Sequence, residues 1–197
     1  MTTTLGAPRE WRVLDIVVGA VIAVAFGPVF LAWNALWEAT IPLFAFFFPV
    51  QAMLYGVWLL PGVLVGLVIR RPGAALLGAF VSAAVSVMLG SIYGADALIS
   101  GAIQGLGAEL GFLIFAYRGW GLMPAIVAGA FSGLAAAVHD VVLYYPAVGF
   151  GLQAAFTAFT VGSGALVAGV GAWLLLRALV RTGVLAEFEA GRGQERI

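Results

Sequence analysis

The residue with the clearest chemical potential is Glu109, a carboxylate within the apolar stretch Gly101–Phe112, GAIQGLGAELGF. An ionisable side chain in the hydrocarbon of a membrane costs roughly 3 kcal/mol on insertion scales, so it needs a partner. Gly105 and Gly101 lie four and eight residues earlier and share nearly one helical face with Glu109. This spacing leaves room above the carboxylate for a second helix or for a small molecule. The alternative is a protonated acid that is hydrogen-bonded inside a helix bundle.

Three other acidic residues, Glu38, Asp96 and Asp140, lie with Glu109 in parts of the sequence that contain no lysine or arginine. His139 is the only basic side chain near them. A group of carboxylates without a fixed counter-charge suits a cationic or amidine-like ligand. The alternatives are that Glu38 and Asp96 are exposed loop charges and that Asp140 makes hydrogen bonds at a helix end.

Aromatic and amide side chains accompany these acids. Trp33 and Trp37, and likewise Asn34 and Glu38, are spaced i,i+4 and therefore share helical faces. Such a mixture suits stacking and cation–π contact with a flat, positively charged ring, together with directional hydrogen bonds. We predict a binding site formed by twelve side chains: Glu109, Gln104, Gln51, Tyr55, Trp33, Asn34, Trp37, Glu38, Tyr93, His139, Asp140 and Tyr144.

The composition is that of an integral membrane protein. Hydrophobic residues make up 63% of the chain and charged residues 9%, whereas soluble domains carry about a quarter charged residues. A formal net charge of zero argues against nucleic acid as a partner. The absence of cysteine and lysine excludes thiolate metal sites, a P-loop lysine and a Schiff-base lysine. We therefore expect no cofactor and no metal site, and any ATP hydrolysis must occur on another subunit.

Six apolar segments are long enough to cross a membrane. They are Val13–Trp33, Ile41–Ile69, Pro72–Ser91, Leu98–Tyr117, Leu122–Leu143 and Leu152–Leu179. The second is too long for a perpendicular helix, and Pro42, Pro49 and Pro61 predict that it kinks or protrudes. We predict an all-α membrane protein with one membrane domain over residues 1–197, of which 184–197 form a cytoplasmic tail.

The arginines predict how this bundle is oriented. With six spans, every arginine falls on the side that holds both termini, and the opposite loops contain none. The nine are Arg9, Arg12, Arg70, Arg71, Arg118, Arg177, Arg181, Arg192 and Arg196. The positive-inside rule then places both termini in the cytoplasm.

Small residues follow one another at i+4 spacing in several of these segments. In the first segment Gly19, Ala23 and Gly27 form such a row, which would let another helix approach closely. We predict that this row docks a membrane partner, because Val and Ile residues that are compatible with lipid flank it. The alternative is packing within the bundle.

Ser163, in a Gly-Ser-Gly sequence, and His139 leave an intramembrane serine hydrolase as a distant alternative. However, the intramembrane proteases that offer a comparison present their serine before the histidine, and Gly-Ser-Gly is common in packed helices. An enzyme is therefore not the expected function.

The chain resembles the YkoE-like substrate-binding components, or S components, of energy-coupling-factor (ECF) vitamin transporters. The similarity covers most of the chain and is concentrated in four stretches: Tyr55–Trp58 (YGVW), Ile69–Leu76 (IRRPGAAL), Ile103–Glu109 (IQGLGAE) and Arg181–Leu185 (RTGVL). Asp140 also fits the family pattern, whereas His139 does not carry over. The resemblance implies a six-helix protein in the plasma membrane of a prokaryote. Such a protein captures thiamine or its hydroxymethylpyrimidine precursor from outside. A transmembrane coupling subunit and two ATPase subunits then drive uptake, and the coupling subunit would meet the small-residue row of the first segment.

Within this resemblance we expect Glu109, with the amides Gln104 and Gln51, to bind the aminopyrimidine edge by charge-assisted hydrogen bonds. The outer aromatic residues would stack on the rings, and Glu38 or Asp140 would offset the thiazolium charge. Gln104 and Glu109 lie about 140° apart on a helical wheel, so they need not touch one ligand. The competing hypotheses are an accessory membrane subunit without a ligand and an S component for another small vitamin.

Overall fold

The computed structural model of the protein describes residues 11–192, except for the side chains of Glu189 and Arg192. Arg9 and Arg196 of the arginine pattern lie outside this range. The structure consists of helical elements, in chain order: α1 Val13–Phe44, the 3-10 segment η1 Phe48–Leu54, α2 Gly56–Ile69, α3 Ala74–Met88, α4 Asp96–Ile114, α5 Leu122–Leu143, α6 Phe150–Ser163, the π-helical segment η2 Gly164–Val170, α7 Gly171–Arg181 and α8 Glu189–Arg192. The predicted all-α class is confirmed, since no strand occurs between residues 11 and 192.

Five helical stretches within residues 11–192 are long and apolar enough to cross a membrane, and α3 is a sixth, shorter apolar helix of 15 residues. The predicted ends of the first two segments are wrong. The first helix does not end at Trp33 but continues through Pro28 to Phe44. Pro42 lies in its last turn, and Pro49 is the second residue of the separate 3-10 segment η1. The long second segment is therefore the end of α1, then η1, then α2.

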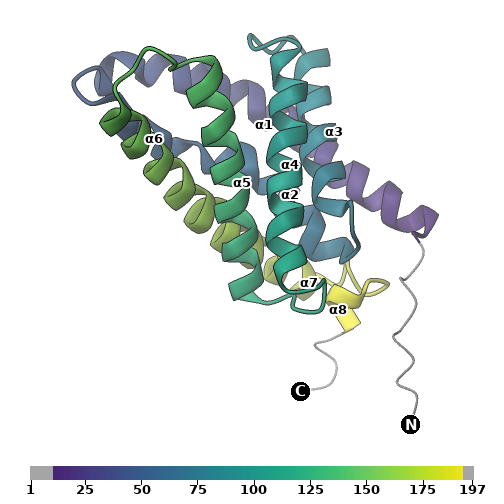
Figure 1. The fold of residues 1–197 in the computed structure, drawn as a ribbon. Coiled ribbons are helices and arrows are strands. Elements are labelled where there is room, and N and C mark those ends of the chain that lie inside the picture. The colour runs from purple at the N-terminus through teal and green to yellow at the C-terminus, as the bar shows by residue number, and fades with distance from the viewer. Residues whose placement is uncertain (1–10, 193–197) are drawn as a thin grey trace.

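Helix α2 forms the centre of the bundle. Every residue from Leu59 to Ile69 is buried, as expected for a helix that is apolar on all sides. Figure 1 shows α4 and α5 crossing in front of α2, while the long helix α1 passes obliquely behind them. The α1, α3, α5, α7 and α8 helices and η2 also contact α2.

Glycines allow α3 and α4 to pack backbone against backbone. A Cβ atom at Gly101 would lie 2.7 Å from the Cβ of Ala83, and one at Gly105 would lie 2.7 Å from the Cα of Leu76. Of the two occupants that the spacing allows beside these glycines, a second helix or a small molecule, the structure shows the helix α3. Gly101 also borders the cavity described below.

The small-residue row of α1 also packs inside the molecule. Gly19, Ala23 and Gly27 are all buried, and a Cβ atom at Gly27 would lie 2.2 Å from Val85 of α3. The Ser82 hydroxyl of α3 donates to the carbonyl oxygen of Ala23 over 3.0 Å. The row thus packs within the bundle, which is the alternative that the sequence left open, and it allows close contact between α1 and α3.

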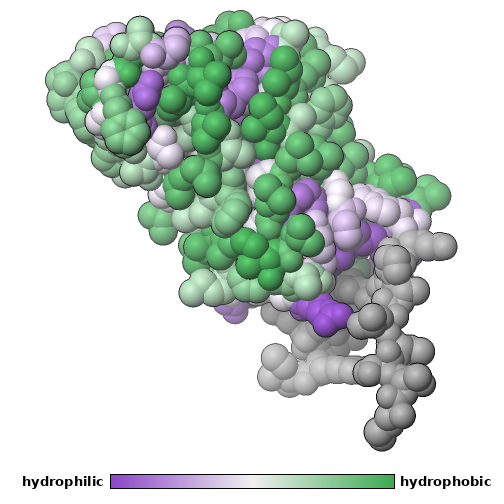
Figure 2. Space-filling view, in the orientation of Figure 1, coloured by the Kyte–Doolittle hydropathy of each residue, from purple (hydrophilic) through white to green (hydrophobic). Residues whose placement is uncertain are grey.

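The arginines gather at one end of the bundle, where α1 begins, α2 meets α3, α4 meets α5, and α7 ends. We call this the arginine-bearing end; its described side chains are Arg12, Arg70, Arg71, Arg118, Arg177 and Arg181. Arg71 forms an ion pair with the buried Asp15 over 2.7 Å, which joins the start of α1 to the α2–α3 turn. Figure 2 shows hydrophilic residues at this end, beside the grey trace, and again at the opposite end, with a mainly hydrophobic surface between them.

Candidate ligand-binding site

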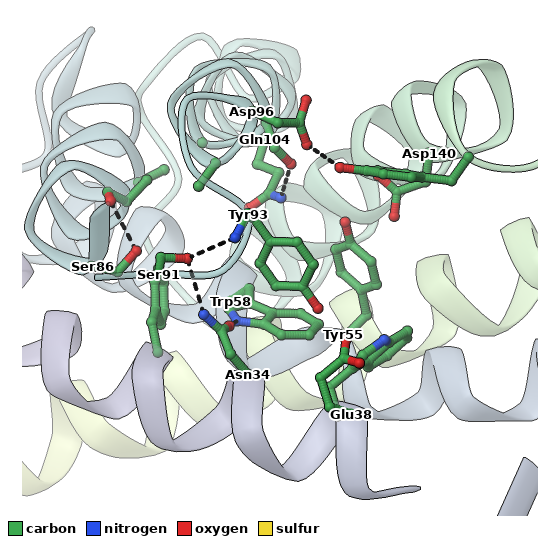
Figure 3. Close-up of a pocket in the computed structure, with 18 of the residues that line it drawn as sticks. Asn34, Glu38, Tyr55, Trp58, Ser86, Ser91, Tyr93, Asp96, Gln104 and Asp140 are labelled. Atoms are coloured by element: carbon green, nitrogen blue, oxygen red, sulfur yellow. Dashed lines mark hydrogen bonds between the residues drawn. The ribbon is translucent and has the colours of Figure 1, made fainter. Parts of the chain in front are cut away.

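A cavity of about 340 Å³ opens at the end opposite the arginines. Its volume is within the range of ~300–1,000 Å³ that is usual for small-molecule sites. Helices α1, α3, α4 and α5, the start of α2 and the loops that follow α3 and α5 form its walls. Its lining residues are Phe30, Asn34, Trp37, Glu38, Tyr55, Trp58, Ala79, Ala83, Ser86, Ser91, Tyr93, Asp96, Ala97, Ser100, Gly101, Gln104, Asp140, Tyr144 and Tyr145. Figure 3 shows the polar and aromatic side chains pointing toward one another across it.

One face of α4 supplies the polar wall of the cavity. Asp96, Ser100 and Gln104 follow one another at four-residue spacing, so they lie above one another on the helix. At a rise of about 1.5 Å per residue, this wall extends roughly 12 Å into the bundle. The Gln104 amide nitrogen donates to the Ser100 hydroxyl over 2.7 Å. The wall therefore runs from a carboxylate at the mouth to an amide at depth.

Aromatic rings form the facing wall. The Trp58 ring centroid lies 5.2 Å from those of Trp37 and Tyr55 and 6.3 Å from that of Tyr93, with the rings inclined at 56° to 88°. Asn34 fixes the Trp58 ring, because its side-chain oxygen accepts the indole N–H over 3.0 Å. Rings that meet at such angles can surround a cation with several π-faces.

Three carboxylates, Glu38, Asp96 and Asp140, border the cavity. The only basic side chain that contacts any of them through a hydrogen bond or ion pair in the described part of the chain is His139. Its Nε2 lies 3.2 Å from Asp96 and its Nδ1 lies 2.9 Å from Asp140. No lysine or arginine lines the cavity, so the site as a whole favours a positively charged ligand.

Two tyrosine hydroxyls in the loops beside these acids remain protonated at neutral pH. Burial, followed by the nearby Glu38 carboxylate, raises the pKa of Tyr93. Burial also raises the pKa of Tyr144, whose hydroxyl donates to Asp96 over 2.5 Å. Both phenols therefore act as hydrogen-bond donors at the mouth of the cavity.

Eight of the predicted binding residues line this cavity: Asn34, Trp37, Glu38, Tyr55, Tyr93, Gln104, Asp140 and Tyr144. Of the others, His139 lies behind two of the carboxylates. Trp33 and Gln51 do not line the cavity. The Trp33 indole donates to the carbonyl oxygen of Leu54 over 2.8 Å, and the Gln51 amide donates to that of Trp37 over 2.8 Å. Trp33 and Gln51 thus fix η1 against α1.

Contrary to the prediction, Glu109 does not line this cavity. Its Oε1 accepts hydrogen bonds from the backbone N–H groups of Ala75 at 2.6 Å and Leu76 at 3.2 Å, and the Tyr117 hydroxyl donates to Oε2 over 2.5 Å. Gly73, which precedes α3, has no side chain with which to cap that helix. Glu109 caps it from α4 instead, because the first N–H groups of a helix lack partners and favour a negative charge. Gln104, on another face of α4, does line the cavity.

The cavity also has polar and aromatic lining residues that were not among the twelve predicted from the sequence: Trp58, Asp96, Ser91, Ser100 and Tyr145. Two sequence signals could have identified members of this set. Trp58 follows Tyr55 by three residues, which places both rings on one helical face. Asp96 is one of the acidic residues without a nearby arginine. The serines belong to the general hydroxyl content of the helices and carry no such signal.

Ser163, the candidate nucleophile, has a structural role at the start of α2. Its hydroxyl accepts the N–H of Gly56 over 2.9 Å and donates to the carbonyl oxygen of Met53 over 2.6 Å. A Cβ atom at Gly56 would lie 2.6 Å from the Ser163 backbone oxygen. This close contact holds the junction of η1 and α2, which presents Tyr55 to the cavity. His139 is engaged by two carboxylates, so the structure provides no serine–histidine pair.

Comparisons with known proteins agree on a transport component. A family model described as the permease component of an ABC-type cobalt transport system matches residues 14–135. The chain is 32% identical over 186 residues to the putative HMP/thiamine permease protein YkoE of Bacillus subtilis strain 168, a match that covers 93% of this chain and 92% of that protein. The solved crystal structure of an S-component of an ECF transporter matches with a TM-score of 0.89 and 30% identity, over 95% of this chain and 94% of that one.

The sequence and structural matches extend over nearly the whole chain, and they agree with the helical bundle and its cavity. They also indicate a transport component rather than an enzyme. The chain therefore belongs to the YkoE-like family of S components, the substrate-binding membrane subunits of ECF transporters.

Proposed function

We propose that this protein captures thiamine, or its hydroxymethylpyrimidine precursor, in the cavity between α1, α3, α4 and α5. The observation that carries the proposal is a set of inclined aromatic rings facing three carboxylates, with no lysine or arginine in the lining. The name of the Bacillus subtilis relative, an HMP/thiamine permease, supports the same ligand class.

The chemistry of thiamine matches the two walls of the cavity. Its thiazolium ring is flat and permanently positive, which suits contact with the Trp37 and Trp58 rings and charge compensation by Asp140 or Glu38. Its aminopyrimidine ring carries a donor and acceptors, which suit the Gln104 amide and the Ser100 hydroxyl. The precursor shares only the pyrimidine. We therefore expect thiamine to bind more tightly than the precursor.

We further propose that the cavity opens to the outside of a prokaryotic plasma membrane and that both termini lie in the cytoplasm. The arginine-bearing end supports this orientation through the positive-inside rule. A transmembrane coupling subunit and two ATPase subunits would then move the captured vitamin inward. This division of labour agrees with a chain that contains no lysine and hence no P-loop lysine.

A metal ion is the second ligand class to consider, because the matching family model is described by cobalt transport. Within the described residues, no group of three or more His, Cys, Asp or Glu side chains is placed to hold a metal ion. Both ring nitrogens of His139 already contact carboxylates. The organic cation is therefore the better match.

Mass spectrometry of the denatured, purified protein tests this proposal, because a tightly bound vitamin is retained through purification. Titration calorimetry with thiamine, hydroxymethylpyrimidine and Co²⁺ then compares the three ligands directly. We expect thiamine to be retained and to bind with the highest affinity. Binding of Co²⁺ alone would contradict the proposal, and binding of none of the three would favour an accessory subunit or a different vitamin.

A further inference from the structure

Asn34, on α1, is a buried amide that reaches two walls of the cavity. Its side chain is 5% exposed. The side-chain oxygen accepts the indole N–H of Trp58 over 3.0 Å, and the amide nitrogen donates to the Ser91 hydroxyl oxygen over 3.1 Å. An indole N–H can only donate, so it determines which end of the amide faces Trp58. The amide therefore has one orientation, and each of its ends already has a protein partner.

Ser91 extends this connection into the loop that follows α3. Its hydroxyl oxygen also accepts the backbone N–H of Tyr93 over 3.4 Å, and Figure 3 shows the two bonds meeting at Ser91. The Tyr93 and Trp58 ring centroids lie 6.3 Å apart, with the rings inclined at 88°. A single amide thus connects the Trp58 ring to the loop that carries Tyr93.

We propose that Asn34 is a positioning residue that gives the site its preference for a cationic ligand, because it holds the Trp58 ring in place opposite Tyr93. This inference rests on the proposed function, in which the thiazolium ring meets Trp58 and the pyrimidine meets Gln104. Attraction between a cation and a ring requires the cation to lie over the ring face, so a turned Trp58 ring weakens the thiazolium contact. The pyrimidine contact with Gln104 does not depend on that ring.

Asn34→Leu has a side chain of similar size but offers Trp58 no acceptor. A buried N–H without a partner is costly, so the Trp58 ring turns toward another acceptor or toward water. We expect the thiamine affinity to fall about tenfold and the hydroxymethylpyrimidine affinity to fall no more than about threefold. Calorimetry on the full-length protein measures both affinities. A variant that binds thiamine with the wild-type ratio of the two affinities overturns the inference and leaves the proposed function standing.

A double-mutant cycle with Trp58→Phe tests whether Asn34 acts through the indole. Phenylalanine keeps an aromatic ring but has no N–H to bond. In the Trp58→Phe protein, Asn34→Leu should therefore change the thiamine affinity by less than about twofold. The same tenfold loss in both backgrounds would show that Asn34 itself contacts the ligand, and it would overturn the positioning role.

Gln51→Met is the matched control for the loss of a buried amide. Gln51 is also 5% exposed and also makes two hydrogen bonds, to the carbonyl oxygen of Trp37 and to the Thr40 hydroxyl, but it does not line the cavity. Its replacement should lower the unfolding temperature about as much as Asn34→Leu does and leave the ratio of the two affinities within about twofold of the wild type. An equal change of that ratio in both variants overturns the inference.

The indole N–H signal of Trp58 in an NMR spectrum makes the test without a ligand. Among the six tryptophans of the chain, it is the signal that disappears in Trp58→Phe. We expect this signal to shift in Asn34→Leu, while that of Trp173, at the arginine-bearing end, stays in place. Ser91→Ala removes the other partner of the amide without a change in α1, so it serves if Asn34→Leu does not fold. It should shift the same signal and lower the thiamine affinity about threefold.

The outcomes separate this inference from the proposed function. A Trp58 signal and a thiamine affinity that both stay as in the wild type, in Asn34→Leu or in Ser91→Ala, overturn the positioning role. A wild-type protein that binds no thiamine overturns the proposed function and with it the preference for a cation, and the Trp58 signal then still decides whether Asn34 holds the ring.

Discussion

The two ends of α4 each hold a carboxylate, and the two carboxylates have opposite surroundings. Near the arginine-bearing end, Glu109 accepts hydrogen bonds from two backbone N–H groups and from the Tyr117 hydroxyl. At the cavity end, Asp96 meets a tyrosine hydroxyl and His139, beside Asp140 and Glu38. Glu109 thus has donors fixed by the fold, whereas the acids at the cavity end share a single basic side chain.

The difference shows how to separate a structural acid from a binding acid in a membrane bundle. A buried carboxylate that caps a helix is compensated by partial positive charge on backbone N–H groups, so it needs no ligand. A group of carboxylates around a cavity is compensated only in part, so the remaining negative charge is available to a cation. The following predictions test this contrast, beginning with the largest expected effect.

Replacement of Glu109 should affect stability far more than binding. Glu109→Ala leaves the N–H groups of Ala75 and Leu76 without their acceptor, so we expect the free energy of unfolding to fall by about 3 kcal/mol. Unfolding in detergent, followed by circular dichroism, measures this loss. The matched control is Glu38→Ala at the exposed mouth, which should change stability by no more than about 0.5 kcal/mol. Equal losses in both variants would remove the contrast between the two acids.

Replacement of Trp58 should affect binding at the cavity end. Trp58→Leu removes a ring that contacts Trp37, Tyr55 and Tyr93, and we expect thiamine affinity to fall about 30-fold, or roughly 2 kcal/mol. Trp173→Leu is the matched control at the other end, where the Trp173 ring packs 4.7 Å from the Arg177 guanidinium carbon. The control should bind thiamine like the wild type in calorimetry. Similar losses in both would indicate a general effect of tryptophan removal.

Ser163 connects the interior of the bundle to the cavity, so its replacement should have an intermediate effect. Ser163→Ala removes two buried hydrogen bonds at the start of α2, and we expect a loss of about 1–2 kcal/mol in the free energy of unfolding. Thiamine affinity should fall only a few-fold, because Tyr55 keeps its packing. Thr182→Ala, at an exposed position, serves as the control in the same unfolding assay and should match the wild type. Loss of all binding in Ser163→Ala would instead indicate a direct role in ligand contact.

The phenol of Tyr144 should have the smallest effect. Tyr144→Phe removes one hydrogen bond to Asp96, and because the side chain is exposed we expect thiamine affinity to fall less than about fivefold. Folding raises the pKa of Tyr144. Its contribution to stability is therefore complete below the unfolded pKa of about 10 and declines as pH rises above that value. Ultraviolet titration of tyrosinate, compared between the wild type and Tyr144→Phe, checks this; ionisation of Tyr144 near pH 9 would contradict it.

The fold class could be predicted from the sequence because long apolar segments have few alternatives to membrane helices. The helix ends could not, because Pro28 and Pro42 are both tolerated within α1. A row of small residues predicts that a helix packs closely, but not against which neighbour. For that reason the spacing of Gly19, Ala23 and Gly27 is equally compatible with a partner subunit and with α3, against which they pack in the structure.

The cavity residues were predictable where an acidic, aromatic or amide side chain recurred at helical spacing, as with Asn34 and Glu38. The role of Glu109 could not be predicted, because its partners, the N–H groups of Ala75 and Leu76, lie 34 and 33 residues earlier in the chain. Only the packing of α3 against α4 brings them together. A backbone donor has no signature in the sequence, so a carboxylate that caps a distant helix resembles one that awaits a ligand.

The most direct test of the ligand site is a comparison of thiamine affinity in Asp140→Asn and Glu109→Gln, measured by calorimetry on folded protein. Asp140→Asn removes a charge that faces the cavity, and we expect affinity to fall at least about tenfold. Glu109→Gln keeps an acceptor for α3 and lies outside the cavity, so its affinity should stay within about threefold of the wild type. The reverse result, with binding lost in Glu109→Gln and kept in Asp140→Asn, would contradict this assignment of the site.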